Sequence, residues 1–194
     1  MRHALAVLAV LALPGCNNDK ATEPPRPFAI TADAIGHYCG MNVLEHTGPK
    51  GQILLKSRRD PVWFSSARDT LAFTMLPDEP KDIAAVFVSD MAKAPSWEEP
   101  GPENWVEARK AWFVVGGTAR GGMGAEETVP FSDRDAAERF ATEKGGHVYA
   151  FADVPREAVL TEGGEAPGQS AHSEDGDGGS GHPVAAPNLL GTQP

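Results

Sequence analysis

A repeated pattern at two strand-helix junctions is the feature that most constrains how this 194-residue chain can fold. It runs from Phe64 to Phe73 and again from Phe131 to Phe140, with an Arg-Asp pair inside each copy. A serine after a β-branched or aromatic stretch is typical of a helix N-cap, so each copy predicts a strand followed at once by a helix. The chain is therefore predicted to be α+β, with two small related ββαβ-type units, each a small sheet with one helix. A match this short can also arise by chance, which would leave the same elements unrelated.

The elements predicted around these junctions follow from apolar runs and from the turn residues between them. The first helix is expected to begin after Ser65 or Ser66 and to end near Met75, and the second to be capped by Ser132 and to end at Gly145-Gly146. Strands are expected at residues 52–56, 62–64, 83–89, 111–115, 129–131 and 147–151, with a further one opening at 28–30. The predicted organisation is 1–15 signal peptide, 16–27 tether, 28–90 first unit, 91–110 connector, 111–160 second unit and 161–194 tail.

The N-terminus is typical of an exported lipoprotein. A short basic lead precedes an apolar run at residues 4–13, which is too short to span a bilayer but has the length of a signal-peptide core. Leu13-Pro14-Gly15-Cys16 follows and resembles a bacterial lipobox, although Pro14 is unusual there. We therefore expect acylation of Cys16 and membrane attachment. The alternative is an ordinary secretory signal with a chance cysteine.

Charge and composition narrow the classes of partner. The formal net charge is −10, and no basic stripe is present to neutralise phosphates, which argues against a nucleic-acid partner. The tail at 161–194 is rich in Gly, Pro, Ser and acidic residues, which predicts disorder. Its His172 and His182 could bind a divalent metal weakly, but a solvated tail is the simpler interpretation.

Cys39 is the candidate centre of function because it is the only thiol left if Cys16 is acylated. An exported protein with one thiol has no internal disulfide partner for it, so the thiol is buried and inert, reactive, or metal-bound. In Cys39-Gly40-Met41 a thiol and a thioether stand two residues apart, and soft sulfur ligands select Cu(I). Met123, in the glycine-rich loop at 116–124, is a further sulfur candidate. His37 and His46 are weaker candidates, since an isolated His is more often a surface or hydrogen-bonding residue.

Three segments together resemble the NosL family. They are Cys39-Gly40-Met41 after a lipobox, Val114-Val115-Gly116 before Gly122-Met123-Gly124-Ala125-Glu126, and the helix start at Pro130-Phe131-Ser132. The likeness covers about residues 28–160. The chain departs from the family in having Gly121-Gly122 before the later Met, where relatives often have a Pro, and in its long tail.

The resemblance implies a function and a site. It implies a non-enzymatic copper chaperone of denitrification that binds Cu(I) and delivers it for the copper-sulfide centre of nitrous oxide reductase. It also implies assembly partners in the membrane, including an ATPase, a possible homodimer, and a fold similar to part of organomercurial lyase. The family's ligands correspond to Cys39, Met41 and Met123. The expected location is the periplasmic face of a bacterial membrane, with the outer membrane favoured over the inner.

Two other functions stay open from the residues alone. Cys39 could be the nucleophile or redox centre of a thiol-dependent enzyme or redox lipoprotein, with His37 or His46 as its base. The chain could also be a lipoprotein adaptor that only docks partners and binds no metal.

Overall fold

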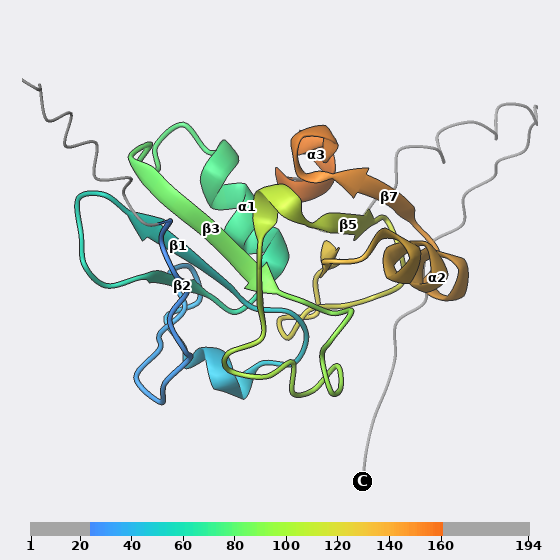
Figure 1. The fold of residues 1–194 in the computed structure, drawn as a ribbon, viewed down its shortest axis with the longest axis horizontal. Helices are drawn as coiled ribbons and strands as arrows, with labels where there is room; N and C mark the ends of the chain where they lie inside the picture. The colour runs from blue at the N-terminus through green and yellow to red at the C-terminus, as the bar shows by residue number, and fades with distance from the viewer. Residues whose placement is uncertain (1–23, 161–194) are drawn as a thin grey trace, which may run out of the picture. The chain divides into compact units, whose positions relative to one another are not determined.

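The computed structural model describes residues 24–160 (Figure 1). The predicted signal peptide, the lipobox with Cys16, most of the tether, and the tail with His172 and His182 lie outside the described residues. Within residues 24–160 no helix has the length and apolar character needed to cross a membrane.

The first sheet has four antiparallel strands in the order β2-β1-β3-β4. They are β1 (Gly51–Leu55), β2 (Val62–Phe64), β3 (Ile83–Ser89) and β4 (Trp105–Glu107). Ile53 pairs with Val62 on one side and Val86 on the other and is fully buried, which places it at the centre of the sheet. Helix α1 (Ala67–Met75) packs across β1 and β3 and buries Leu71 and Phe73. Its N-cap is Ser66, one of the two serines predicted for this role, which accepts a hydrogen bond from the Asp69 N–H.

The second sheet has three antiparallel strands in the order β6-β5-β7 and packs against α2. The elements are β5 (Trp112–Val115), β6 (Val129–Phe131), α2 (Arg134–Lys144) and β7 (His147–Ala150). The N-cap predicted at Ser132 is wrong, because Asp133 holds that position and its carboxylate accepts a hydrogen bond from Ala136. The helix ends at Gly145 as predicted, with a positive φ of 78° that glycine adopts without strain.

Both halves follow the order strand, strand, helix, strand, and they share one hydrophobic core. That core contains Ile53 and Leu71 from the first half and Phe113 from the second. The segment expected to be a connector contributes β4 to the first sheet, and the short helix α3 (Arg156–Leu160), which was not predicted, packs against α1. These contacts make the described residues part of one compact unit.

The strand expected at 28–30 is absent from the structure. The Phe28 N–H and C=O bond to the side chain of Gln52, and the Ile30 N–H donates to the Pro102 carbonyl. The buried Gln52 side chain and the Pro102 carbonyl thus supply the hydrogen bonds that a neighbouring strand would otherwise make to the backbone of this segment.

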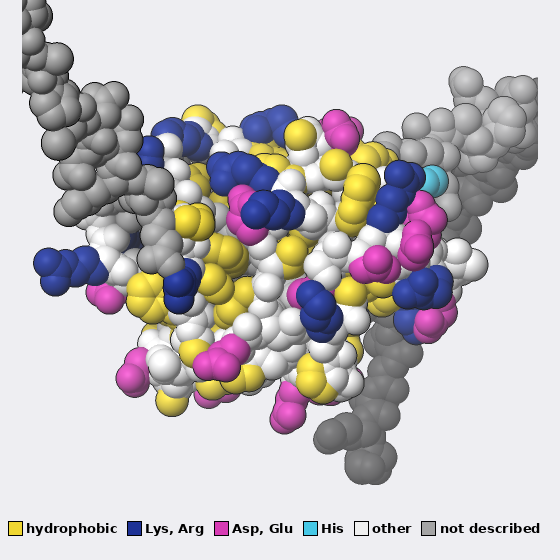
Figure 2. Space-filling view, viewed as in Figure 1, with side chains coloured by type: hydrophobic (Ala, Val, Ile, Leu, Met, Phe, Trp, Pro, Cys, Tyr) yellow, Lys and Arg dark blue, Asp and Glu magenta, His cyan; other side chains and the backbone are white. Residues whose placement is uncertain are grey.

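The surface visible in Figure 2 carries both signs of charge. Lys and Arg side chains alternate there with Asp and Glu and with scattered hydrophobic residues, and this face presents no continuous basic stripe. A face of this kind gives little attraction for a polyanion.

Candidate metal centre

Cys39 lies in a tight loop that is docked on the edge of β2. The loop is closed by a bridge between Ile35 and Asn42 and by hydrogen bonds from Gly36 N–H to the Met41 carbonyl (2.8 Å) and from Gly40 N–H to the Gly36 carbonyl (2.9 Å). The His37 N–H donates to the carbonyl of Trp63 in β2, which ties the loop to the first sheet.

Two glycines shape this loop for different reasons. Gly40 has a φ of 67°, a conformation that L-residues with side chains rarely adopt. Gly36 leaves room for the thiol, because a Cβ at this position would lie 2.5 Å from the Cys39 Sγ. The Cys-Gly-Met motif therefore depends on a second glycine, three residues before the cysteine, that sequence reasoning did not single out.

The half-buried Cys39 thiol is surrounded by polar groups from three segments. Its Sγ lies 3.5 Å from the Ser65 hydroxyl, 4.0 Å from the His46 Nε2 and 3.9 Å from the Met41 carbonyl. Ser65 comes from the end of β2, where the sequence suggested only a helix cap. A hydroxyl next to a thiolate can donate a hydrogen bond and stabilise the charge that a metal ligand carries.

His46 is the imidazole that the structure brings to the thiol. The 3-10 turn η1 (Val43–Glu45) reverses the chain after Asn42, whose side chain caps the turn by accepting from the Leu44 N–H. The turn returns His46 to within contact of Cys39, seven residues earlier, and buries it to 8% exposure. Among the described residues its side chain has no other hydrogen-bond partner, so no competing hydrogen bond prevents the Nε2 that faces the thiol from acting as a metal ligand.

His37 has a different role. Its Nε2 lies 3.3 Å from the Glu79 carboxylate, and its ring packs edge-on against Phe64 and Phe73. Tyr38 also donates to Glu79, at 2.9 Å. His37 and Tyr38 thus anchor the segment just before the cysteine to an aromatic cluster and to one carboxylate.

The glycine-rich loop of the second half reaches this site over His46. A Cβ on Gly122 would lie 2.5 Å from the His46 Cβ and 2.9 Å from the Thr47 backbone nitrogen, so only glycine permits this approach. Met123 is the next residue, and its side chain is 55% exposed. Gly122, the second glycine of the Gly121-Gly122 pair, is therefore the residue of this loop that touches the first half of the site. Met41, 38% exposed, lies on the Cys39 loop itself.

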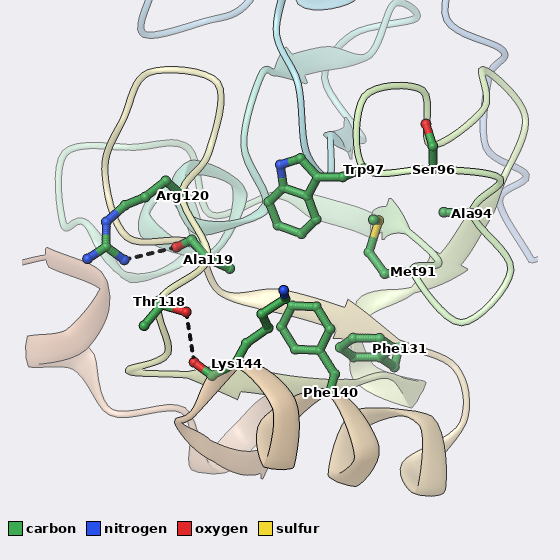
Figure 3. A pocket seen from close by; sticks show the side chains of 10 residues that line it. All are labelled: Met91, Ala94, Ser96, Trp97, Thr118, Ala119, Arg120, Phe131, Phe140 and Lys144. Carbon is green, nitrogen blue, oxygen red and sulfur yellow. Dashed lines mark hydrogen bonds between the residues drawn. The ribbon is translucent and has the colours of Figure 1, made fainter.

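A separate cavity of about 490 Å³ is lined in part by residues 118–120 of the glycine-rich loop that carries Met123 (Figure 3). The Thr118 hydroxyl closes one side by donating to the Lys144 carbonyl at 3.0 Å, and the Trp97 ring stacks on Phe140 with an 11° angle between the planes. The lining residues are Met91, Ala94, Ser96, Trp97, Thr118, Ala119, Arg120, Phe131, Phe140 and Lys144. None of the candidate ligands is among them, so the cavity is not part of the metal centre.

Within residues 24–160 no group of three or more His, Cys, Asp and Glu side chains is placed to hold a metal ion. Among the described residues, the ligands that could complete a site with Cys39 and His46 are therefore of another kind, such as a thioether. A site of one thiolate, one imidazole and thioether sulfur favours a soft monovalent ion over a hard divalent one.

Comparison with known proteins agrees with this chemistry. The family model described as NosL matches residues 27–159. The chain belongs to the NosL family. It is 44% identical over 162 residues to the copper-binding lipoprotein NosL of Achromobacter cycloclastes and 31% identical over 159 residues to that of Stutzerimonas stutzeri. The first alignment covers 83% of both chains and the second 81% of both.

A solved NosL structure has a similar fold. The crystal structure of the copper chaperone NosL from Shewanella denitrificans superimposes with a TM-score of 0.64 at 36% identity, over 68% of this chain and 97% of that one. These NosL proteins are named for copper binding or a chaperone role, and none is named as an enzyme. The predicted family and the expectation of a non-enzymatic protein are thereby confirmed.

Proposed function

We propose that the chain is a lipid-anchored chaperone that binds one Cu(I) ion through Cys39, His46 and Met123, with Met41 as a further thioether next to the site. The observation that carries the proposal is the 4.0 Å separation of the Cys39 Sγ and the His46 Nε2, directly under the loop that bears Met123. The family resemblance implied Cys39, Met41 and Met123 as ligands. The proposed set adds His46 and places Met41 next to the site.

The separation suits a metal ion of low coordination number. Zinc in proteins has bonds of roughly 2.3 Å to sulfur and 2.0 Å to nitrogen. With bonds of this length, a metal ion between the Cys39 Sγ and the His46 Nε2 spans their 4.0 Å separation at a sulfur–metal–nitrogen angle of roughly 140°. Such an angle lies between linear and trigonal, so one side of the ion stays open for a soft third ligand. The exposed Met123 and Met41 supply thioether sulfur on the solvent side of the site.

Delivery to nitrous oxide reductase, membrane anchoring through Cys16 and a periplasmic location complete the proposal. They are supported by the lipoprotein and copper-chaperone names of the relatives and by the lipobox-like sequence. The membrane and ATPase assembly partners, a homodimer, and the fold likeness to part of organomercurial lyase stay predictions. The outer membrane, rather than the inner, is likewise a prediction.

The test is an anaerobic Cu(I) titration of the full chain in detergent against a competing chelator. We expect about one equivalent of Cu(I), with a loss of at least about a hundredfold in affinity for Cys39→Ser and smaller losses for His46→Ala and Met123→Leu. The matched controls are His147→Ala, an exposed His on β7, and Met75→Leu at the end of α1, which should bind like wild type. Equal binding by wild type and Cys39→Ser would reject the proposal.

The thiol-enzyme alternative rests on the same Cys39 and His46 pair, but the relatives are named for copper binding and a chaperone role and not for catalysis. A catalytic Cys-His pair normally has a third group that orients the imidazole, and no described residue bonds the other His46 nitrogen. The rate of thiol alkylation against pH tests this function. A thiol that reacts as an ordinary free cysteine, without turnover of thiol or disulfide substrates, argues against it.

A further inference from the structure

Glu127 is a buried carboxyl at the base of the loop that carries Met123, and it joins the two halves of the molecule. Its side chain is 3% exposed. Its Oε1 accepts hydrogen bonds from the backbone N–H of Arg68 (2.8 Å), from that of Thr128 (2.9 Å) and from the Ser66 hydroxyl (3.4 Å). The bond to Arg68 connects residues 59 positions apart in the sequence.

The first turn of α1 is a favourable place for this acceptor. The N–H groups of a first turn have no partner inside the helix, so a carboxyl oxygen placed there satisfies one of them whether or not the carboxyl is ionised. Ser66 takes the Asp69 N–H, and Glu127 takes the Arg68 N–H. A residue of the second half therefore completes the cap of a helix in the first half.

The other carboxyl oxygen of Glu127 faces the loop. Oε2 has no hydrogen-bond partner within residues 24–160, and a Cβ added to Gly121 would lie 2.7 Å from it. Burial raises the pKa of the Glu127 carboxyl to about 8, although the N–H groups of Arg68 and Thr128 act in the opposite direction; the nearby Asp69 also raises it. The carboxyl is therefore mostly protonated at neutral pH, with Oε2 the natural place for the proton because Oε1 accepts three bonds.

The loop above Glu127 is closed by its own backbone bonds. The Gly121 N–H donates to the Ala125 carbonyl (2.9 Å), the Gly124 N–H to the Gly121 carbonyl (2.8 Å) and the Glu127 N–H to the Ala119 carbonyl (3.1 Å). A displacement of Glu127 is thus passed to the whole loop rather than absorbed at one bond.

The same junction also holds the thiol. Ser65 and Ser66 are adjacent residues; the first contacts the Cys39 Sγ and the second contacts Glu127. The Cys39 loop therefore contacts one of these two serines directly, and the Met123 loop contacts the other through Glu127. Both serines lie where β2 ends and α1 begins.

We propose that Glu127 is a positioning residue of the metal centre, which fixes the Met123 loop to the first turn of α1 and so sets Met123 over Cys39 and His46. This inference rests on the proposed function and adds to it a residue that touches no metal. Glu127 acts only through the place it gives to the loop.

The experiment is a double-mutant cycle on Cu(I) affinity with the full chain in detergent. If Glu127 acts through Met123, then Glu127→Ala lowers affinity about tenfold in the wild-type background and less than about twofold in the Met123→Leu background. X-ray absorption of the copper-loaded Glu127→Ala chain should show one sulfur ligand fewer than wild type. Glu127→Gln, which keeps an acceptor for the Arg68 N–H, should restore most of the affinity. Glu143→Ala, on an exposed residue of α2, is the control and should leave affinity unchanged.

The outcomes separate this inference from the proposed function. Equal losses from Glu127→Ala in both backgrounds, or no loss at all, would overturn the positioning role while Cys39-dependent binding by wild type stands. If Glu127→Ala does not fold, Gly121→Ala decides, because it removes no hydrogen bond and only pushes the loop away from Oε2. An affinity loss for Gly121→Ala that disappears in the Met123→Leu background supports the role, and wild-type affinity refutes it. If wild type itself binds no Cu(I), the proposed function fails, and this inference fails with it.

Discussion

Replacing Glu127 by Gln should change how the stability of the protein depends on pH. The native carboxyl has a pKa of about 8, because it is buried, whereas its ordinary value is 4.5. Between these values the native state holds a proton that the unfolded chain has lost. The free energy of unfolding therefore falls as pH rises through this window, and the neutral amide of the variant removes this contribution.

The expected size follows from the width of the window. Each pH unit between the two pKa values costs about 1.4 kcal/mol, so from pH 5 to pH 7.5 the wild type should lose about 3 kcal/mol relative to Glu127→Gln. Two neighbouring groups remain in both proteins. Burial lowers the pKa of Lys50 to about 8 and raises that of Asp69. Glu127 itself raises the pKa of Lys50, and Asp69 raises that of Glu127, so the difference between the two proteins reports Glu127 together with its coupling to these two groups.

Urea unfolding at pH 5, 6 and 7.5, followed by tryptophan fluorescence, measures this difference. Glu126→Gln is the control, since its side chain is 33% exposed and pairs with Arg120, and it should show no comparable pH dependence. If wild type and Glu127→Gln keep a constant difference within about 0.5 kcal/mol over this range, the carboxyl ionises as in water and the burial argument is refuted.

Two further changes test the Cys39 loop. Gly36→Ala places a Cβ 2.5 Å from the thiol sulfur, so the thiol or the loop must move, and the Cu(I) affinity should fall at least about tenfold in the chelator titration; wild-type affinity would show that the loop is pliable. Glu79→Ala removes the acceptor that holds Tyr38 and His37. The pKa of Tyr38, which burial and then Glu79 raise above its usual range, should move down in an ultraviolet titration, and an unchanged value would contradict the contact.

The sequence predicted most of the secondary structure because local signals were strong. The strands at Val62–Phe64, Ile83–Ser89 and Val129–Phe131 were predicted with the bounds that the structure gives. Each is a short β-branched or aromatic run between turn residues. Strand β4 and helix α3 were missed because their residues carry little periodicity. β4 is stabilised by pairing with β3, and α3 by packing against α1, which are tertiary contacts.

The residues of the candidate site likewise fall into two groups, those with a local sequence signal and those placed by tertiary contacts. Cys39, Met41 and Met123 are readable because soft sulfur has a specific chemistry. The preference for His46 over His37 was not readable, because it depends on the turn at η1 and on the carboxylate of Glu79. Ser65 and Glu127 were not found either, and no local signal marks them. Ser65 is brought to the thiol by β2, and Glu127 caps a helix 59 positions away.

On the proposed function, the exposure of the ligands determines the order in which copper can be released. Met123 and Met41 are 55% and 38% exposed, whereas His46 is only 8% exposed and Cys39 is half-buried. An incoming ligand from an acceptor therefore meets the thioethers first, and thioether sulfur carries no charge to hold the ion. Exchange should begin at the methionines while the thiolate and the imidazole still retain copper, so that the ion is never free in solution. The glycines beside both methionines let these segments move aside, since Gly40 and Gly124 have positive φ values and their α-carbons face open space. The thiolate and imidazole then govern how tightly the ion is held, and the two methionines govern how readily it is passed on.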